Sequence, residues 1–262
     1  KITPSGSITE FSISSNSSYI YPISITKGPD NNLWFAEFNT GMIGKITTNG
    51  TVTKYSLPTA DTELWDITAG PDGNLWFTEE NKSKIGRITT NGQITEFNTI
   101  SNLGVSGITA GPDGNIWFTG GGVNKIGRIT PSGVVTEFTV PTTGGDLNDI
   151  VAGPDGNLWF TESSALKIGR ITTNGSVTEF KVPITTGYLG SITAGPDGNL
   201  WFVTSTSTGA NGYALFKLTP TGTFTQFNLS ANSGANDITV GPDGNIWFTE
   251  TFGNKIAKVS CG

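Results

Sequence analysis

The sequence contains no histidine among its 262 residues. Histidine is the commonest general base and the commonest transition-metal ligand, so Ser-His-Asp catalysis and histidine-bound zinc are excluded. Cysteine is almost as scarce, because Cys261 is the single one in the chain. It cannot form a disulfide within the chain, and we expect an ordinary thiol there.

Charge and long apolar runs are also scarce. Only 14% of the residues are charged, and 15 Lys and Arg against 21 Asp and Glu give a net charge of −6. This acidic balance argues against nucleic acid and anionic membranes as partners. No apolar run is long enough for a membrane-spanning helix. The chain starts at Lys1 rather than Met, and we expect a secreted or extracytoplasmic monomer.

Glycine is abundant, with 36 residues, and one stretch recurs throughout the chain. Its second copy runs from Asp66 to Glu79 and contains the turn Gly-Pro-Asp-Gly-Asn followed by Leu-Trp-Phe. The turn begins at residues 70, 111, 153, 195 and 241, and a variant with Asn31 in place of the second glycine begins at residue 28. Spacings of about 42 residues over the whole chain indicate a single repeat-built domain.

Each repeat predicts four strands. In the second copy, residues 66–69 and 75–78 flank the Gly-Pro-Asp-Gly turn, and residues 84–89 and 93–97 flank an Asn-Gly hairpin turn. Four antiparallel strands per 42 residues are typical of a β-propeller blade. The sequence therefore predicts an all-β, six-bladed β-propeller over residues 1–262, with blade motifs starting near residues 23, 65, 106, 148, 190 and 236. Trp76 and its five equivalents are predicted to form the core between blades.

The two ends of the chain suggest how the ring closes. The last repeat stops after a third strand, at residues 254–260, whereas the first eleven residues read as the end of a third strand, a turn and a fourth strand. We therefore expect residues 1–13 to complete blade six, with the N-terminal strand as its fourth strand.

Acidic residues are concentrated on one face of this propeller, here called the top face. It carries the connections from the second to the third strand and from one blade to the next. The turn aspartates lie on the opposite face, where each caps its own turn. Eleven of the 21 acidic residues fall on the top face: Glu37, Asp61, Glu63, Asp66, Glu79, Glu80, Asp146, Asp149, Glu162, Asp237 and Glu250.

Such carboxylates at a channel mouth either bind a hard cation or are neutralised by nearby lysines. The metal hypothesis places Mg²⁺ or Ca²⁺ as a cofactor among these top-face carboxylates. The alternative uses the lysines that follow the glutamates in sequence, Lys84, Lys125, Lys167 and Lys255.

Aromatic residues on the top face suggest a ligand site. Trp65 is the only tryptophan outside the repeat motif, and Tyr19, Tyr21, Phe38, Tyr188 and Phe252 join it. Aromatic faces at a polar rim suit sugars or other flat ligands, although a loop aromatic can equally cover its own blade. The predicted ligand-binding residues are Trp65, Tyr21, Tyr188 and Asp149, with a small molecule or a glycan as the partner.

The repeat Gly-Pro-Asp-Gly-Asn-Leu/Ile-Trp-Phe-Thr-Glu, followed by Lys-Ile-Gly-Arg-Ile-Thr and Val-Thr-Glu-Phe, resembles that of the streptogramin lyases, or virginiamycin B lyase-like proteins. The resemblance implies a seven-bladed propeller that opens a cyclic depsipeptide antibiotic by elimination, with Mg²⁺ and a histidine base. It also implies a site Glu-X-His-Gly-Ile-Thr that leads into the turn and its closing glutamate. The second blade here reads Glu63-Leu64-Trp65-Asp66-Ile67-Thr68 and closes at Glu79.

Both carboxylates of that implied site are present, but Trp65 occupies the position of the histidine. The resemblance therefore implies Glu63 and Glu79, with Asp146 and Glu162 at the equivalent places in blade four, as the metal ligands. Asn148 takes it in blade four, and Ile23, Ser106, Gly190 and Asn236 take it elsewhere. No catalytic residue is therefore predicted. We expect a binding module for a ligand or a cation. The alternatives are a divergent metal-dependent lyase or hydrolase that uses the top-face carboxylates, and a structural scaffold without a site.

Overall fold

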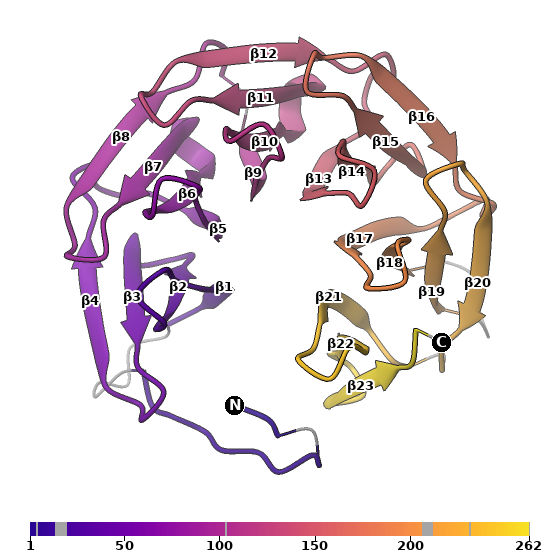
Figure 1. Cartoon of the computed structure of the whole chain (residues 1–262), viewed down its shortest axis with the longest axis horizontal. Helices are drawn as coiled ribbons and strands as arrows, with labels where there is room; N and C mark the ends of the chain where they lie inside the picture. The colour runs from indigo at the N-terminus through magenta and orange to yellow at the C-terminus, as the bar shows by residue number, and fades with distance from the viewer. Residues whose placement is uncertain (4, 14–19, 103, 206–211, 231, 262) are drawn as a thin grey trace.

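Six antiparallel sheets are arranged in a ring in the computed structural model (Figure 1). The structure describes residues 1–3, 5–13, 20–102, 104–205, 212–230 and 232–261. Within each sheet, neighbouring strands follow one another in the sequence, and the first strand of each repeat is the innermost. The predicted six-bladed β-propeller is confirmed.

The first blade consists of β1 (Pro22–Lys27), β2 (Leu33–Glu37), β3 (Met42–Ile46) and β4 (Val52–Ser56). The second consists of β5 (Leu64–Ala69), β6 (Leu75–Glu79), β7 (Lys84–Ile88) and β8 (Ile94–Asn98). The third consists of β9 (Val105–Ala110), β10 (Ile116–Gly120), β11 (Lys125–Ile129) and β12 (Val135–Thr139). The fourth consists of β13 (Leu147–Ala152), β14 (Leu158–Glu162), β15 (Lys167–Ile171) and β16 (Val177–Lys181).

The fifth blade consists of β17 (Tyr188–Ala194), β18 (Leu200–Ser205), β19 (Tyr213–Leu218) and β20 (Phe224–Asn228). The sixth has three strands, β21 (Ala235–Val240), β22 (Ile246–Glu250) and β23 (Lys255–Val259). The described helices are two short 3₁₀ turns, η1 (Glu80–Lys82) and η2 (Gly121–Val123). In the described part of the chain, no helix has the length and apolar character needed to cross a bilayer.

The repeated turn holds the tryptophan that follows it. In the second blade, the indole N–H of Trp76 donates to Oδ1 of Asp72 at 3.0 Å, and the backbone N–H of Asn74 donates to the same oxygen. Gly73 has a φ of 75°, which favours glycine at that place in the turn. The turn aspartate therefore caps its own turn, as predicted, and also fixes the indole.

Each enclosed tryptophan is packed between strands and between blades. Trp76 stacks on Phe97 of the fourth strand, with ring centroids 5.5 Å apart, and the Arg87 guanidinium lies 5.5 Å from the indole centroid. Trp76 also belongs to one apolar cluster with Ile108 and Phe118 of the third blade. The predicted inter-blade role is confirmed for Trp34, Trp76, Trp117, Trp159 and Trp201, which are at most 1% exposed. Trp247 in the sixth blade is half-exposed instead.

The prediction that residues 1–13 complete blade six was wrong for this structure. The sixth sheet ends at β23, and the N-terminal segment forms its own hairpin through a bridge between Ile2 and Ile8. The Lys1 amino group donates to the Thr9 carbonyl in the same hairpin. Ile8 is therefore paired with Ile2 and not with β23. Figure 1 shows this segment on the open side of the ring, between the sixth and first blades.

Candidate functional site

The innermost strands of the second, fourth and sixth blades each carry an aspartate at a β-bulge. In β5, the register with β6 shifts between Leu64 and Ile67, and Asp66 lies within the shift. The backbone N–H of Asp66 donates to Oγ1 of Thr78 at 3.0 Å, which holds the bulged residue in place. The same bond forms at Asp149 and Asp237. Because a bulge re-aims side chains, these three aspartates reach the central cavity of the ring.

Two of these aspartates also link neighbouring blades. Oδ2 of Asp66 accepts a hydrogen bond at 3.0 Å from the backbone N–H of Ile108 in the third blade, and Oδ1 accepts from the Ser24 hydroxyl in the first. Oδ2 of Asp149 accepts at 2.8 Å from the backbone N–H of Ile192 in the fifth blade. Both carboxylates therefore stabilise the inner ring, whatever else they bind.

A cavity of about 330 Å³ lies at the top of the central channel, where all three aspartates meet. The amides of Asn148 and Asn236 and the hydroxyls of Ser24 and Ser191 add neutral polar groups to its wall. Trp65 and Tyr21 line it as well. The cavity therefore combines acidic groups, hydrogen-bonding groups and aromatic rings.

Withdrawal from bulk water raises the pKa of the cavity aspartates. Burial raises the pKa of Asp149 to about 8, and repulsion from Asp66 acts in the same direction. The pKa of Asp66 is also raised by burial, against the opposing effect of its hydrogen bonds. Close to neutral pH, Asp149 therefore carries a proton and can donate as well as accept a hydrogen bond.

Three aromatic side chains form a chain along the rim of this cavity. Phe38 lies edge-on to Trp65, with centroids 6.1 Å apart, and Tyr21 lies edge-on to Phe38 at 6.3 Å. Tyr21 is 50% exposed. Tyr19, which the sequence also placed on this face, lies outside the described residues. Trp65 is thus supported by neighbouring rings and presents part of its surface to the cavity.

Of the four predicted ligand-binding residues, Trp65, Tyr21 and Asp149 line the same cavity. Tyr188 lines an adjoining cavity of about 490 Å³, together with Tyr213 and Phe252. The two cavities share Asn148, Gly190 and Asn236 in their walls. Tyr188 is therefore separated from the other three by this shared wall.

The glutamates of the metal hypothesis lie away from the channel cavity. Glu79 and Glu162 end β6 and β14 and are fully buried, and among the described residues neither carboxylate oxygen of either side chain has a hydrogen-bond partner. Burial raises the pKa of each to about 7, and the charges of Glu96 and Glu179 add to the effect. Glu63 is half-buried and Asp146 is exposed.

The neighbouring lysines pair with other carboxylates. Nζ of Lys84 lies 2.8 Å from Oε2 of Glu96, and Lys167 is 2.7 Å from Glu179. Lys125 makes the same pair with Glu137 in the third blade, where Gly120 stands in place of the glutamate. The lysines thus form the same ion pairs whether or not a buried closing glutamate is present, and in these three blades none of them makes an ion pair with such a glutamate.

The first blade is the exception, because its charges are exchanged. Lys54 occupies the position of Glu96, and Met42 the position of Lys84. Nζ of Lys54 then reaches Oε1 of Glu37 at 2.6 Å, and the Thr40 hydroxyl donates to Oε2. Here a closing glutamate is neutralised directly.

The residues do not fit a metal centre built from all four predicted ligands. Glu63 and Glu79 belong to the second blade, whereas Asp146 and Glu162 belong to the fourth. Within the described ranges, no three acidic or cysteine side chains are grouped closely enough to hold a metal ion. The cofactor prediction stays untested, and we derive no chemical step from a metal here.

The resemblance stated above pointed to one position per blade for a catalytic base. Five of these six positions line the channel cavity, namely Ile23, Trp65, Asn148, Gly190 and Asn236. Sequence reasoning singled out Asn148 and Asn236 only as replacements for a base. It did not predict them as cavity residues, although their place directly before the bulged aspartate is a usable signal.

A comparison with protein families gives a match to the virginiamycin B lyase family over residues 1–143 and 99–262. The chain belongs to this family. Among solved structures, a catalytically inactive virginiamycin B lyase from Staphylococcus aureus with quinupristin is 36% identical, with a TM-score of 0.89. The match covers 97% of this chain and 85% of that chain.

Two further solved structures are similar to this chain. A streptogramin B lyase structure is 31% identical over 92% of this chain and 83% of its own, with a TM-score of 0.82. The extracellular domain of a putative hybrid two-component system from B. thetaiotaomicron is 19% identical, covers 92% of this chain and 34% of its own, and has a TM-score of 0.68. This last likeness shows the fold alone. No curated protein sequence matches the chain.

Proposed function

We propose that this member of the virginiamycin B lyase family is a binding module that holds a small hydroxyl-rich ligand or a glycan in the channel cavity. The observation that carries the proposal is the composition of the cavity wall. Asp66, Asp149 and Asp237 meet Asn148 and Asn236 around a volume of about 330 Å³. Carboxylates and amides recognise hydroxyl groups, and the indole of Trp65 at the rim provides a flat face for a sugar ring.

Binding without the family's elimination chemistry is consistent with the sequence, because it has no histidine at all. A relative of this chain was solved with quinupristin. We expect incubation with quinupristin, followed by mass spectrometry, to give no linearised product. Production of a linear peptide by the purified chain would contradict the proposal.

The direct test is a glycan array followed by isothermal titration of the strongest hits. We expect Trp65→Ala to weaken binding by about tenfold to a hundredfold, as the loss of a stacked aromatic would. Tyr188→Ala is the matched control in the adjoining cavity. If the ligand is confined to the channel cavity, this variant should bind it with the same affinity as wild type. A ligand that binds wild type and Trp65→Ala equally would rule out this cavity as its site.

A second candidate function is a divergent metal-dependent lyase or hydrolase, favoured by the raised pKa values of Glu79 and Glu162. A carboxylate with a pKa of about 7 is matched to proton abstraction near neutral pH. Titration with Mg²⁺ and with Ca²⁺, repeated on Glu79→Gln and Glu162→Gln, separates the two functions. Absence of binding heat with both ions would remove this candidate and leave the glycan proposal intact.

A further inference from the structure

A second cavity on the top face adjoins the channel cavity. Its volume is about 490 Å³, and most of its wall comes from the fifth and sixth repeats, including the rings of Tyr188, Tyr213 and Phe252. Both cavities lie within the range of about 300–1,000 Å³ that is usual for small-molecule sites. The function proposed above uses the channel cavity alone, so it leaves the adjoining cavity without a role.

The aromatic residues at the adjoining cavity are exposed. Phe252 is the most exposed large apolar side chain among the described residues, at 74%, and Tyr188 is 59% exposed. Tyr213 lies edge-on to Phe252, with ring centroids 6.1 Å apart. Tyr188 makes no ring contact within the described part of the chain. A ring this exposed covers little of its own blade, and its faces are open to a ligand.

Tyr188 holds the same place in the fifth repeat that Tyr21 holds in the first. Each tyrosine lies four residues before the isoleucine that pairs with the motif phenylalanine, which is Ile192 in one repeat and Ile25 in the other. The other four repeats carry acidic residues or glycine at this place, namely Glu63, Gly104, Asp146 and Gly234. Tyrosine thus occurs here in two repeats, and each of the two lines one of the two cavities.

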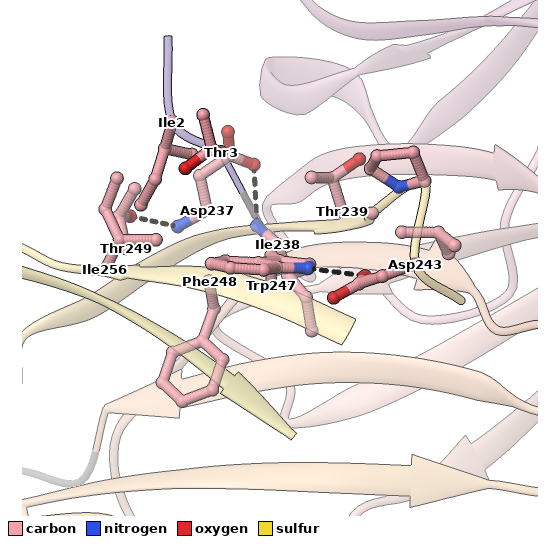
Figure 2. Close-up of a pocket in the computed structure, with 13 residues that line it drawn as sticks. Ile2, Thr3, Asp237, Ile238, Thr239, Asp243, Trp247, Phe248, Thr249 and Ile256 are labelled. Atoms are coloured by element: carbon pink, nitrogen blue, oxygen red, sulfur yellow. Dashed lines mark hydrogen bonds between the residues drawn. The ribbon is translucent and has the colours of Figure 1, made fainter. Parts of the chain in front are cut away.

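Three residues form the wall that the two cavities share, namely Asn148, Gly190 and Asn236. Each lies within the β-bulge of an innermost strand. In the sixth blade, the backbone N–H of Asp237 holds this bulge by donating to Oγ1 of Thr249 at 3.1 Å (Figure 2). The wall is therefore built by the same backbone irregularity that brings the aspartates to the channel.

The middle of this wall is backbone alone, because Gly190 has no side chain. A Cβ atom added there would come within 2.9 Å of Cγ2 of Val203 and 3.1 Å of the Asn236 carbonyl oxygen, so close packing excludes one. The amides of Asn148 and Asn236 stand on either side, in the fourth and sixth blades. Among the described residues, neither amide has a hydrogen-bond partner. Each offers two donors and an acceptor to a molecule that crosses the wall.

We propose that the two cavities are subsites of one binding site for an oligosaccharide of at least two sugar rings. One ring occupies the channel cavity beside Trp65, the glycosidic link crosses the wall at Gly190, and the next ring lies against Tyr188. Hydroxyl groups of both rings bond to Asn148 and Asn236. The inference rests on the glycan-binding function proposed above and adds to it the length of the glycan.

The chemistry of the two subsites favours a neutral oligosaccharide. Each subsite combines an aromatic ring, which suits the apolar face of a sugar, with amides that suit its hydroxyl edge. Asp66, Asp149 and Asp237 line the channel subsite, and no lysine or arginine lines either subsite. Acidic sugars would be repelled by these carboxylates, so we expect sialylated glycans and uronic acids not to bind.

Isothermal titration with matched sugars tests the proposal. The probes are glucose, galactose, mannose and N-acetylglucosamine, each also as its homodisaccharide and homotrisaccharide. We expect a series in which the disaccharide binds wild type about threefold to tenfold more tightly than the monosaccharide, as one more ring against an aromatic side chain would provide. In Tyr188→Ala this gain should vanish, while the affinity for the monosaccharide stays that of wild type.

Two further variants serve as controls. Tyr188→Phe retains the ring and should retain the gain in affinity. Trp65→Ala should weaken binding of the monosaccharide and the disaccharide by the same factor, since both occupy the channel cavity. Tyr188 is exposed, so neither substitution there should change the melting temperature, and a loss of the gain in Tyr188→Ala reports on binding rather than on folding.

The possible outcomes separate this inference from the function on which it rests. A monosaccharide that binds through Trp65, with no gain from a second ring, would overturn the two-subsite proposal and leave the proposed function standing. A gain that Tyr188→Ala leaves intact would do the same, as would two monosaccharides bound per chain with no tighter binding of the disaccharide. Failure of every one of these sugars to bind would overturn both.

Discussion

The carboxylate of Asp66 in the second blade accepts a hydrogen bond at 3.0 Å from the backbone N–H of Ile108 in the third. The bond joins the innermost strands of two blades at the wall of the channel cavity. Asp149 repeats it with Ile192 between the fourth and fifth blades. The same side chains that give the cavity its acidity therefore also hold the ring together, and substitutions there affect stability as well as binding.

Asp66→Ala should lower the free energy of unfolding by about 1–3 kcal/mol, since it leaves buried donors without their acceptor. Urea denaturation measures the change. Asp237→Ala is the matched comparison, because the described residues show no bond to Asp237 from a following blade. We expect its cost to be smaller, and equal costs at the two positions would contradict the inter-blade role of Asp66.

The buried carboxylates of Glu79 and Glu162 should make stability fall as pH rises. The folded pKa of each is raised from 4.5 to about 7, so the folded state binds more protons than the unfolded state between these values. The cost of ionisation is absent below about pH 4.5, grows up to about pH 7, and is constant above that pH. Its size is on the order of 3 kcal/mol for each group, from a shift of about 2.5 pKa units.

Glu79→Gln removes that cost, so its effect on the melting temperature should become more favourable between pH 4.5 and pH 8. Glu96→Gln is the control with the opposite sign. The pKa of Glu96 is lowered by its hydrogen bonds to Lys84 and Thr59, which outweigh burial, and its stabilisation is lost as pH falls. Parallel pH profiles for the two variants would exclude this assignment of charge states.

Trp76→Ala and Trp247→Ala should differ in their cost to stability. Trp76 is fully buried between two blades, and its removal should cost about 3–5 kcal/mol. Trp247 is half-exposed and has no stacked ring among the described residues, so its removal should cost less than about 2 kcal/mol. Chemical denaturation of both variants measures the difference. Equal losses in the free energy of unfolding would mean that Trp247 is as well covered in solution as Trp76.

The sequence by itself determined the repeat and therefore the blade. Glycine, proline and aspartate specify the Gly-Pro-Asp-Gly turn through backbone geometry, and the apolar pattern around Trp76 specifies a strand covered on both faces. These are local effects, and they recur six times, so period and strand number could be predicted. The top-face position of Trp65, Asp149 and Tyr21 followed from the same topology.

Only the tertiary structure decided what depends on neighbouring blades. The pairing of Lys84 with Glu96 rather than Glu79 arises across strands, where two carboxylates compete for one lysine. The hydrogen bond from the Ile108 N–H to Asp66 crosses a blade boundary and joins residues that are 42 positions apart in the sequence. The position of the N-terminal hairpin depended on whether Ile8 pairs with Ile2 or with β23. The segment around Ile2 and β23 have nearly the same strand pattern, so the sequence alone cannot decide between these two pairings.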